Sequence, residues 1–320
     1  MTWKVLAATT ALAAALLTSH ASAETKFVTL GTQGGPITSP HRGQPSNLLV
    51  VNGVNTLVDV GDGTAERLSK IRIPTARVDN ILISHLHFDH MAGLQGILGL
   101  RFQTNSPKPV QVYGPPGTKE LVDGLLASMK PSMEAGYGVP GQKSYTAEEL
   151  VVAHDIKGGD SFELGDVKVK VSHNTHYSFE PGSDEHGKYQ SLSFRFETPD
   201  KIIAFTGDTG PSTDVEELSK GADMLIAEMI DVDFTVEQIK MINPKTPEDR
   251  LNGIKTHLAA HHLTPTDLGV MAANAAVKEL VVTHLIPGSA MTAEHFSKYG
   301  EEIAAKYSGK VTFANDMDEF

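Results

Sequence analysis

The sequence predicts an α/β protein in which strands and helices form layers. Short apolar runs alternate with turn residues and with stretches of helical periodicity along most of the chain. One run, at residues 81–83, is continuously apolar, as in a strand that is covered on both faces. Neither a repeat nor a long Pro-, Gly- or Ser-rich linker divides the chain, so we expect residues 24–320 to form one domain.

The first 23 residues have the pattern of a cleavable export signal. Lys4 precedes an Ala/Leu-rich run at residues 5–17, and Ala21-Ser22-Ala23 offers the small residues that a signal peptidase accepts. The run is short for a bilayer span, so a membrane anchor is the weaker alternative. We therefore expect a signal peptide at residues 1–23 that is cut after Ala23, and a periplasmic or secreted mature protein without membrane contact.

The elements follow in order along the mature chain. Asn52-Gly53 lies between two β-rich runs within residues 47–61, which favours a hairpin with a tight turn. Further strands are expected at residues 80–84, 151–156, 167–172, 190–197, 201–206, 224–228 and 280–283. Helical periodicity is found at residues 118–129, 214–220, 264–276 and 293–306. The strands thus fall into two batches with helices around each.

Composition restricts the partners and the metal ligands. Removal of residues 1–23 takes Lys4 away and moves the formal net charge from −12 to −13. Such a chain repels polyanions and has no basic run, so we expect no nucleic-acid partner. Cysteine is absent from the sequence, which excludes disulfides, thiolate ligands and cysteine nucleophiles. Any metal must therefore be held by nitrogen and oxygen.

Potential metal ligands cluster directly after the strand at residues 80–84. His85, His87, Asp89 and His90 lie within the stretch HLHFDH. In an extended segment His85 and His87 project to one side, and a turn would bring the other two into the same space. Imidazole and carboxylate groups suit zinc and other divalent metals. Because buried ionisable groups are costly unless paired or coordinated, packing does not explain this cluster.

Two metal ions need more ligands than this stretch supplies, and three later strand ends offer them. His176, Asp208 and His284 each follow an apolar strand and precede a loop. His173 is an alternative to His176, although the position just past the strand end favours His176. The GDTG stretch around Asp208 is also compatible with a simple turn.

With these residues the sequence resembles the metallo-β-lactamase-fold hydrolases over most of the mature chain. The resemblance implies a four-layer αβ/βα sandwich with two divalent metal ions between the sheet edges, zinc foremost and manganese or iron as alternatives. One ion would be held by His85, His87 and His176, and the other by Asp89, His90 and His284, with Asp208 as the bridge. No site for an organic cofactor is expected.

Asp208 and His262 point to one branch of that family. The resemblance implies that true β-lactamases lack the bridging carboxylate, and that His262 corresponds to a histidine of the ribonuclease Z-like branch. The expected nucleophile is a metal-bridging hydroxide, with Asp89 orienting the water and protonated His262 as the acid for the leaving group. The alternative is that His262 merely caps or packs beside a helix.

Other residues are given lesser roles. Asp59, in LVDVGDG, either supports the ligand loop by accepting a hydrogen bond from a histidine N–H or belongs to a turn. We expect surface positions for His257 and His261, and exposed positions for His154 and His186. Two stretches are candidates for substrate selectivity: residues 178–190, and residues 229–250 as a lid or pocket wall, with an ordinary surface helix as the alternative for the second.

Among the activities of this branch we expect an exported arylsulfatase that acts on a small-molecule ester. Exported members that carry a segment like THYSF…YQSLSFRFETPDKIIAFTGDTG resemble arylsulfatases. Phosphodiesterase and lactonase activities are the near alternatives. Three other classes fit the sequence less well: a β-lactamase, a tRNA-processing nuclease and a non-catalytic metal-binding protein. Export and net charge both argue against the nuclease. The chain is compatible with a homodimer.

Overall fold

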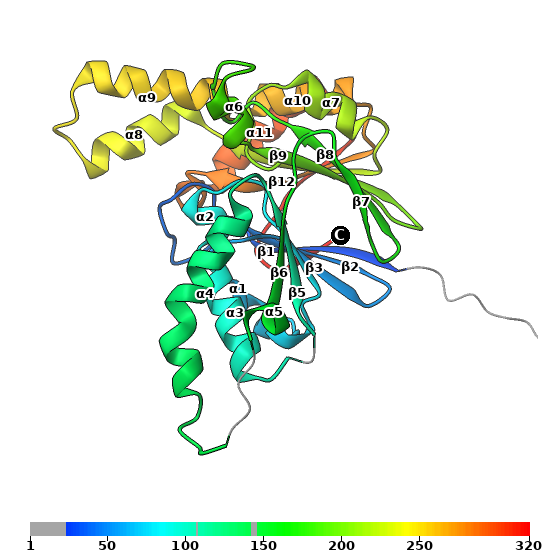
Figure 1. The fold of residues 1–320 in the computed structure, drawn as a ribbon. Coiled ribbons are helices and arrows are strands. Elements are labelled where there is room, and N and C mark those ends of the chain that lie inside the picture. The colour runs from blue at the N-terminus through cyan, green and yellow to red at the C-terminus, as the bar shows by residue number, and fades with distance from the viewer. Residues whose placement is uncertain (1–23, 107, 142–145) are drawn as a thin grey trace, which may run out of the picture.

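The computed structural model describes residues 24–320 except residue 107 and residues 142–145, so the expected signal peptide lies outside the described residues. Two seven-stranded sheets face each other, and helices cover the outer face of each (Figure 1). The layers run helix, sheet, sheet, helix, which confirms the expected four-layer αβ/βα sandwich.

The first sheet has the strand order β14-β1-β2-β3-β4-β5-β6. Its strands are β1 (Thr25–Gly31), β2 (Ser46–Val51), β3 (Val54–Val60), β4 (Asn80–Leu82), β5 (Val110–Gly114), β6 (Val151–Asp155) and β14 (Asp318–Glu319). β2 and β3 form the expected hairpin, where Asn52 and Gly53 have positive φ angles of 50° and 83°. Two left-handed residues match the turn to the twist of the strands. β4 is buried along its length between parallel neighbours, as its apolar run predicts.

The second sheet has the order β13-β12-β11-β10-β9-β8-β7. Its strands are β7 (Ser161–Leu164), β8 (Val167–His173), β9 (Leu192–Glu197), β10 (Ile202–Phe205), β11 (Met224–Ile230), β12 (Glu279–Ile286) and β13 (Lys310–Phe313). The strand expected at residues 151–156 is β6 and belongs to the first sheet, because it pairs in parallel with β5. The two batches of strands in the sequence therefore do not coincide with the two sheets.

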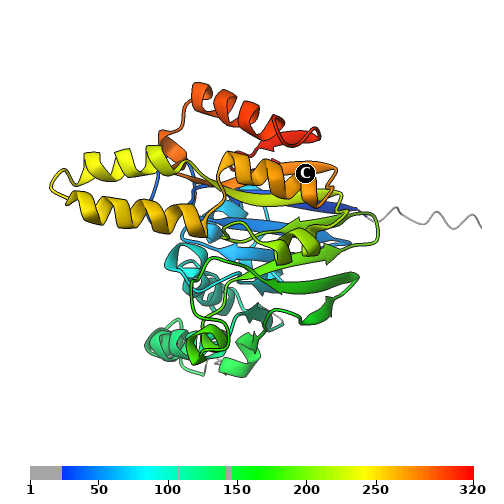
Figure 2. The same ribbon diagram turned by 90° about the horizontal axis from the view of Figure 1, so that it is seen from above.

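Helices cover both outer faces, and one helical pair projects from the body. They are α1 (Thr64–Lys70), α2 (Phe88–Met91), α3 (Leu94–Gln103), α4 (Thr118–Ala135), α5 (Ala147–Leu150), α6 (Asp184–Lys188), α7 (Thr213–Ser219), α8 (Val232–Ile242), α9 (Glu248–His261), α10 (Pro265–Asn274) and α11 (Ala293–Ala304), with short 3₁₀ turns η1 (Thr75–Arg77) and η2 (Gly288–Ala290). α8 and α9 lie side by side as a hairpin that extends away from the sandwich (Figure 2). Among the described residues, no helix has the length and apolar character needed to cross a bilayer.

Each central strand is anchored on both of its faces. Phe27 and Leu49 of the first sheet pack with Phe194 of the second in the core between the sheets. Their neighbours Val28 and Leu48 point the other way, into the core under the helices. This alternation follows from the two-residue period of a strand. Strands that are held on both faces fix the positions of the loops at their ends.

Candidate metal centre

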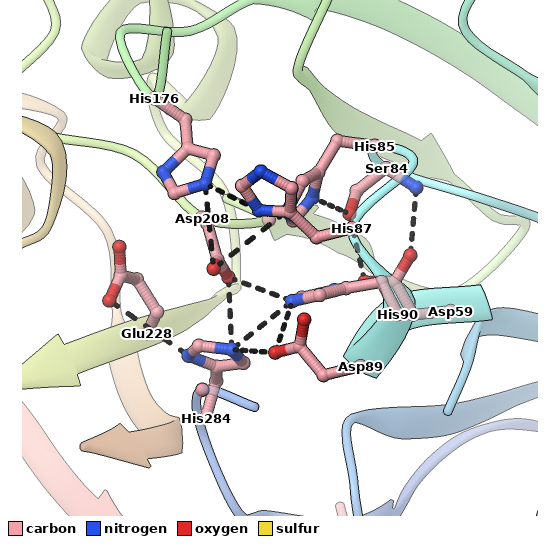
Figure 3. A network of polar contacts seen from close by, with 12 residues as sticks. Asp59, Ser84, His85, His87, Asp89, His90, His176, Asp208, Glu228 and His284 are labelled. Atoms are coloured by element: carbon pink, nitrogen blue, oxygen red, sulfur yellow. Dashed lines mark hydrogen bonds and ion pairs between the residues drawn. The ribbon is translucent and has the colours of Figure 1, made fainter. Parts of the chain in front are cut away.

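The seven candidate ligands meet at one edge of the sandwich (Figure 3). The segment after β4, including α2, carries four of them, and the loops after β8 and β10 and strand β12 carry one each. They are His85, His87, Asp89, His90, His176, Asp208 and His284. Strand ends from both sheets thus surround one small volume, as loops presented by a rigid scaffold do.

Three histidines form the first group of ligands. His87 Nδ1 lies 2.9 Å from His85 Nε2 and 3.1 Å from His176 Nε2. His85 and His176 are buried, whereas His87 is exposed. The exposed imidazole leaves this group accessible from solvent.

The second group joins two histidines and a carboxylate. His90 Nε2 lies 3.2 Å from His284 Nε2. Asp89 Oδ2 lies 3.5 Å from His90 Nε2 and 3.7 Å from His284 Nε2. All three side chains are buried.

Asp208 lies between the two groups and faces each of them with one oxygen. Its Oδ1 is 3.3 Å from His90 Nε2 and 3.2 Å from His284 Nε2. Its Oδ2 is 3.9 Å from His85 Nε2 and 4.0 Å from His176 Nε2. A carboxylate in this position is arranged to bridge two cations.

The donor atoms fit a pair of divalent cations. Asp208 Oδ1 is buried and accepts no hydrogen bond within the described part of the chain, an arrangement that is costly unless a cation is bound. Donor atoms about 2.0–2.1 Å from a tetrahedral zinc lie roughly 3.3 Å from one another. The nitrogen separations of 2.9 to 3.2 Å are close to that spacing. Neutral imidazoles and carboxylates are also the ligands that such ions prefer.

Residues behind the ligands hold most of the imidazoles in place. Asp59 is fully buried, and its carboxylate lies 2.8 Å from His90 Nδ1 and accepts hydrogen bonds from the Ser84 amide and hydroxyl. Ser84 Oγ also lies 3.1 Å from His85 Nδ1. His176 Nδ1 donates to the carbonyl of His261 at 3.1 Å. These contacts occupy the far nitrogens and direct the Nε2 atoms inward. Asp59 therefore supports the ligand loop.

Burial and close approach set the charges in the cluster. Burial lowers the pKa of His85 well below its ordinary value and lowers the pKa of His176 to about 3. Burial also opposes the charged form of His90, but the carboxylates of Asp208 and Asp59 raise its pKa well above the ordinary value. Burial opposes ionisation of Asp208 too, yet His284 and His90 hold its pKa well below the usual range. His85 and His176 are thus neutral, as metal ligands must be.

A β-bulge brings His284 and Glu228 to the site. Ala227 pairs with Val282 and Met229 with Leu285, so two residues of β12 lie opposite one residue of β11. His284 has a φ angle of 43°, in the left-handed region that non-glycine residues rarely adopt. Bulges beside functional sites redirect side chains. This bulge directs the His284 imidazole toward the second ligand group.

His262 forms a buried pair with Glu228 beside the ligands. Its Nδ1 lies 2.9 and 3.0 Å from the two carboxylate oxygens of Glu228. Burial opposes the charged form, but the carboxylate raises the pKa of His262 to about 9. His262 also lies near His176 and Asp208, and the three offer donor atoms within 4.8 Å of one another. With Nδ1 held by Glu228, Nε2 is the nitrogen that can reach a substrate.

The remaining histidines differ partly from expectation. His173 stacks on His186 with ring centroids 5.4 Å apart, away from the ligand groups, so His176 is the histidine at the site. The surface position expected for His261 is wrong, because His261 is buried, with its ring bonded to Ser178 and to the His257 carbonyl. His154 and His186 are half-buried rather than exposed, since each packs against another ring. His257 is exposed, as expected.

A cavity of about 510 Å³ opens onto the ligands. Asp208, His176 and His262 line it together with residues of α8 and α9. The stretch at residues 229–250, expected as a lid, a pocket wall or a surface helix, thus contributes α8 to the wall of this cavity.

Two features of the site were not identified from the sequence: Glu228 and the helix α8 that lines the cavity. Glu228 is an acidic residue in the otherwise apolar stretch MLIAEMI, and a charged residue in a fully buried strand is a signal that it has a partner. α8 has apolar residues at helical spacing, but its connection to the ligands depends on tertiary structure. Phe88, between two ligands in the sequence, also escaped notice.

Comparisons with known proteins agree with this geometry. The family model described as the beta-lactamase superfamily domain matches residues 54–285. A ribonuclease Z of Mycobacterium marinum is 29% identical over 293 residues, which are 91% of this chain and 96% of that protein. The fold is similar to that of human tRNase Z, short form, with a TM-score of 0.62, 23% identity, and coverage of 92% and 98% of the two chains. It is also similar to the metallo-beta-lactamase fold protein YhfI of Bacillus subtilis, with a TM-score of 0.65, 17% identity, and coverage of 92% and 98%.

These relatives overturn three expectations. The prediction of an arylsulfatase is wrong, because the relatives that match nearly full length are named ribonuclease Z. The prediction of a small-molecule ester as partner, with no nucleic acid, is wrong for the same reason. Net charge is a weak guide to such a partner, because it averages over the whole surface and omits any cation that the site would hold. The prediction of a periplasmic or secreted protein is also wrong, since it conflicts with these relatives and depended on residues 1–23, outside the described part of the chain.

Proposed function

The chain belongs to the beta-lactamase superfamily, and on that premise we propose that it is a metal-dependent phosphodiesterase that cleaves RNA. The observation that supports this most is the near full-length match to relatives named ribonuclease Z. The Asp208 carboxylate between two ligand groups and the adjacent His262–Glu228 pair supply the groups that such cleavage needs.

We propose that His85, His87 and His176 hold one divalent cation, that Asp89, His90 and His284 hold a second, and that Asp208 bridges them. The imidazole-rich donor set favours zinc, with manganese or iron as alternatives. Two bound cations would acidify water and neutralise charge on a phosphoryl oxygen. Since the ligands come from both sheets, residues 24–320 would have to act as one domain.

The chain's own residues would then divide the work. Asp89 orients the attacking water, whose oxygen forms a bond to phosphorus and releases a proton to solvent. The bond from phosphorus to the leaving oxygen breaks, and that oxygen takes a proton from His262 Nε2. Glu228 is a positioning residue, because it holds Nδ1 and favours the protonated imidazole. The products are a phosphomonoester and an alcohol, and solvent restores the proton of His262.

The test uses the full chain loaded with zinc or manganese. We expect cleavage of a single-stranded RNA oligonucleotide and of bis-p-nitrophenyl phosphate, with loss of both activities when a chelator is added. Protein that binds two cations per chain but cleaves neither substrate, or that hydrolyses p-nitrophenyl sulfate instead, would contradict the proposal.

A further inference from the structure

The cavity beside the metal centre has a strongly apolar mouth. Ile37, Phe88 and Ile242 come from three separate segments and line the cavity, yet they are 56%, 79% and 68% exposed. Large apolar side chains that gather in the open usually mark a surface that contacts a ligand or a partner. Phe88 lies between His87 and Asp89 in the sequence, so its backbone is held by the segment that carries the ligands.

Charge shows what kind of group can enter. None of the described lining residues is a lysine or an arginine. A phosphodiester backbone that continued into this space would find no lysine or arginine to pair with, and the imidazole of His262 already has the Glu228 carboxylate as its partner. The part of the substrate that fills the cavity is therefore uncharged.

The position of the proton donor shows which part of the substrate it is. His262 lines the same cavity as Leu258 of α9 and Ile239 of α8. The group that receives the proton of His262 consequently lies against the apolar wall. In the proposed reaction that group is the leaving alcohol.

We propose that the α8–α9 hairpin and Phe88 form a binding site for the base of the leaving nucleoside, which makes the enzyme specific for an unpaired nucleotide at the scissile bond. This inference rests on the proposed function. A base that is paired in a duplex presents its ring faces to neighbouring bases, whereas an unpaired base can enter an apolar pocket and stack on an aromatic ring. Gln238 on α8 adds an amide within the cavity that can reach a base edge.

Two exposed residues of α8 provide a matched pair of variants. Ile242 lines the cavity, whereas its neighbour Met241 does not, and they are 68% and 72% exposed. Replacing either by aspartate leaves the packed core untouched. Ile242→Asp places a carboxylate in the base site, and Met241→Asp places the same charge outside it.

Binding is measured on the zinc-loaded protein by calorimetry, with adenosine 3′- and 5′-monophosphate compared with methyl phosphate. Stacking of a base on an aromatic ring typically contributes about 1–3 kcal/mol, so we expect at least a roughly fivefold preference for one adenosine nucleotide in the unmodified protein. Met241→Asp should keep that preference, and Ile242→Asp should reduce it to about threefold or less. No preference in the unmodified protein, or the same preference in all three proteins, would overturn the proposal.

Cleavage separates this inference from the proposed function. We expect a single-stranded RNA to be cut at least about ten times faster than the same strand in a duplex, and Ile242→Asp to diminish that ratio. Equal rates on the two forms would overturn the inference while the proposed function stands. A nucleotide preference without cleavage of either form would support the base site and contradict the proposed function.

Discussion

The two walls of the cavity are built in opposite ways. The ligand wall consists mostly of buried side chains on strand ends, and most of its imidazoles have a second partner behind them. The hairpin wall, α8 and α9, projects from the sandwich (Figure 1). It presents exposed apolar side chains such as Ile242. The groups proposed for the chemistry are thus held mainly by both sheets, whereas the groups proposed for substrate choice lie on a projecting hairpin, which touches the ligand wall at the end of α9 through the His261 carbonyl.

Among the variants of the ligand wall, Asp208→Asn should cause the largest loss of activity and of bound metal. The substitution removes the negative charge that faces both ligand groups. Because metal ions supply several kcal/mol of transition-state stabilisation, we expect kcat/KM on RNA to fall by roughly 10³-fold or more. Metal content, measured by elemental analysis, should fall as well. As a control, Asp166→Asn removes the same charge from an exposed position between β7 and β8. It should leave kcat/KM and metal content unchanged. Full activity in Asp208→Asn would refute its bridging role.

His262→Gln should leave the metal centre loaded but slow the reaction. Loss of a general acid typically costs about 10²–10⁴-fold in rate, and the amide preserves a hydrogen bond to Glu228. The measurement is kcat on bis-p-nitrophenyl phosphate and on a diester with a more basic leaving group. The loss should be greater for the more basic leaving group, since that group needs the proton more. Equal losses on both would assign His262 a structural role.

Asp59→Asn tests the support behind the ligand wall. Asn offers one acceptor where the carboxylate serves His90 and Ser84 together. Changes to such supporting residues typically cost about 10–100-fold in metal affinity or activity. Affinity is measured by competition with a chelator, and excess zinc should restore most of the activity. An unchanged affinity would mean that the ligand loop holds itself in place.

Glu228→Gln should give the smallest change in rate and the clearest change with pH. In the metal-free protein the His262 imidazole should titrate near pH 9, and NMR should detect a lower midpoint once the carboxylate is gone. A raised pKa in the folded state stabilises the fold fully below the ordinary value of about 6.5, and this contribution is lost as pH rises through 9. In Glu228→Gln the free energy of unfolding should therefore no longer show this decrease between pH 7 and pH 10. An unchanged midpoint would show that the Glu228 carboxylate does not raise the pKa of His262.

The sequence predicted the ligand wall far better than the hairpin wall. His176 and Asp208 each follow an apolar strand, and that position brings them to the sheet edge. His284 lies within β12, where the bulge directs it to the same edge. Glu228 was missed because its partner, His262, is distant in sequence, and only the bulge in β12 reveals how β11 and β12 meet there.

The apolar residues of α8 were ambiguous for a different reason. Their spacing is the same whether they pack on a core or line a cavity, and only tertiary structure decides between the two. Net charge, which argued against a nucleic-acid partner, averages over the whole surface and omits cations bound at the site.

The central claim is that seven side chains from both sheets hold two cations. Elemental analysis of the full chain, purified and dialysed against metal-free buffer after loading with zinc, tests it most directly. The account predicts two zinc ions per chain, and about one or fewer in Asp208→Asn at the same protein concentration. Retention of no metal by the unmodified protein, or an unchanged content in the variant, would contradict it.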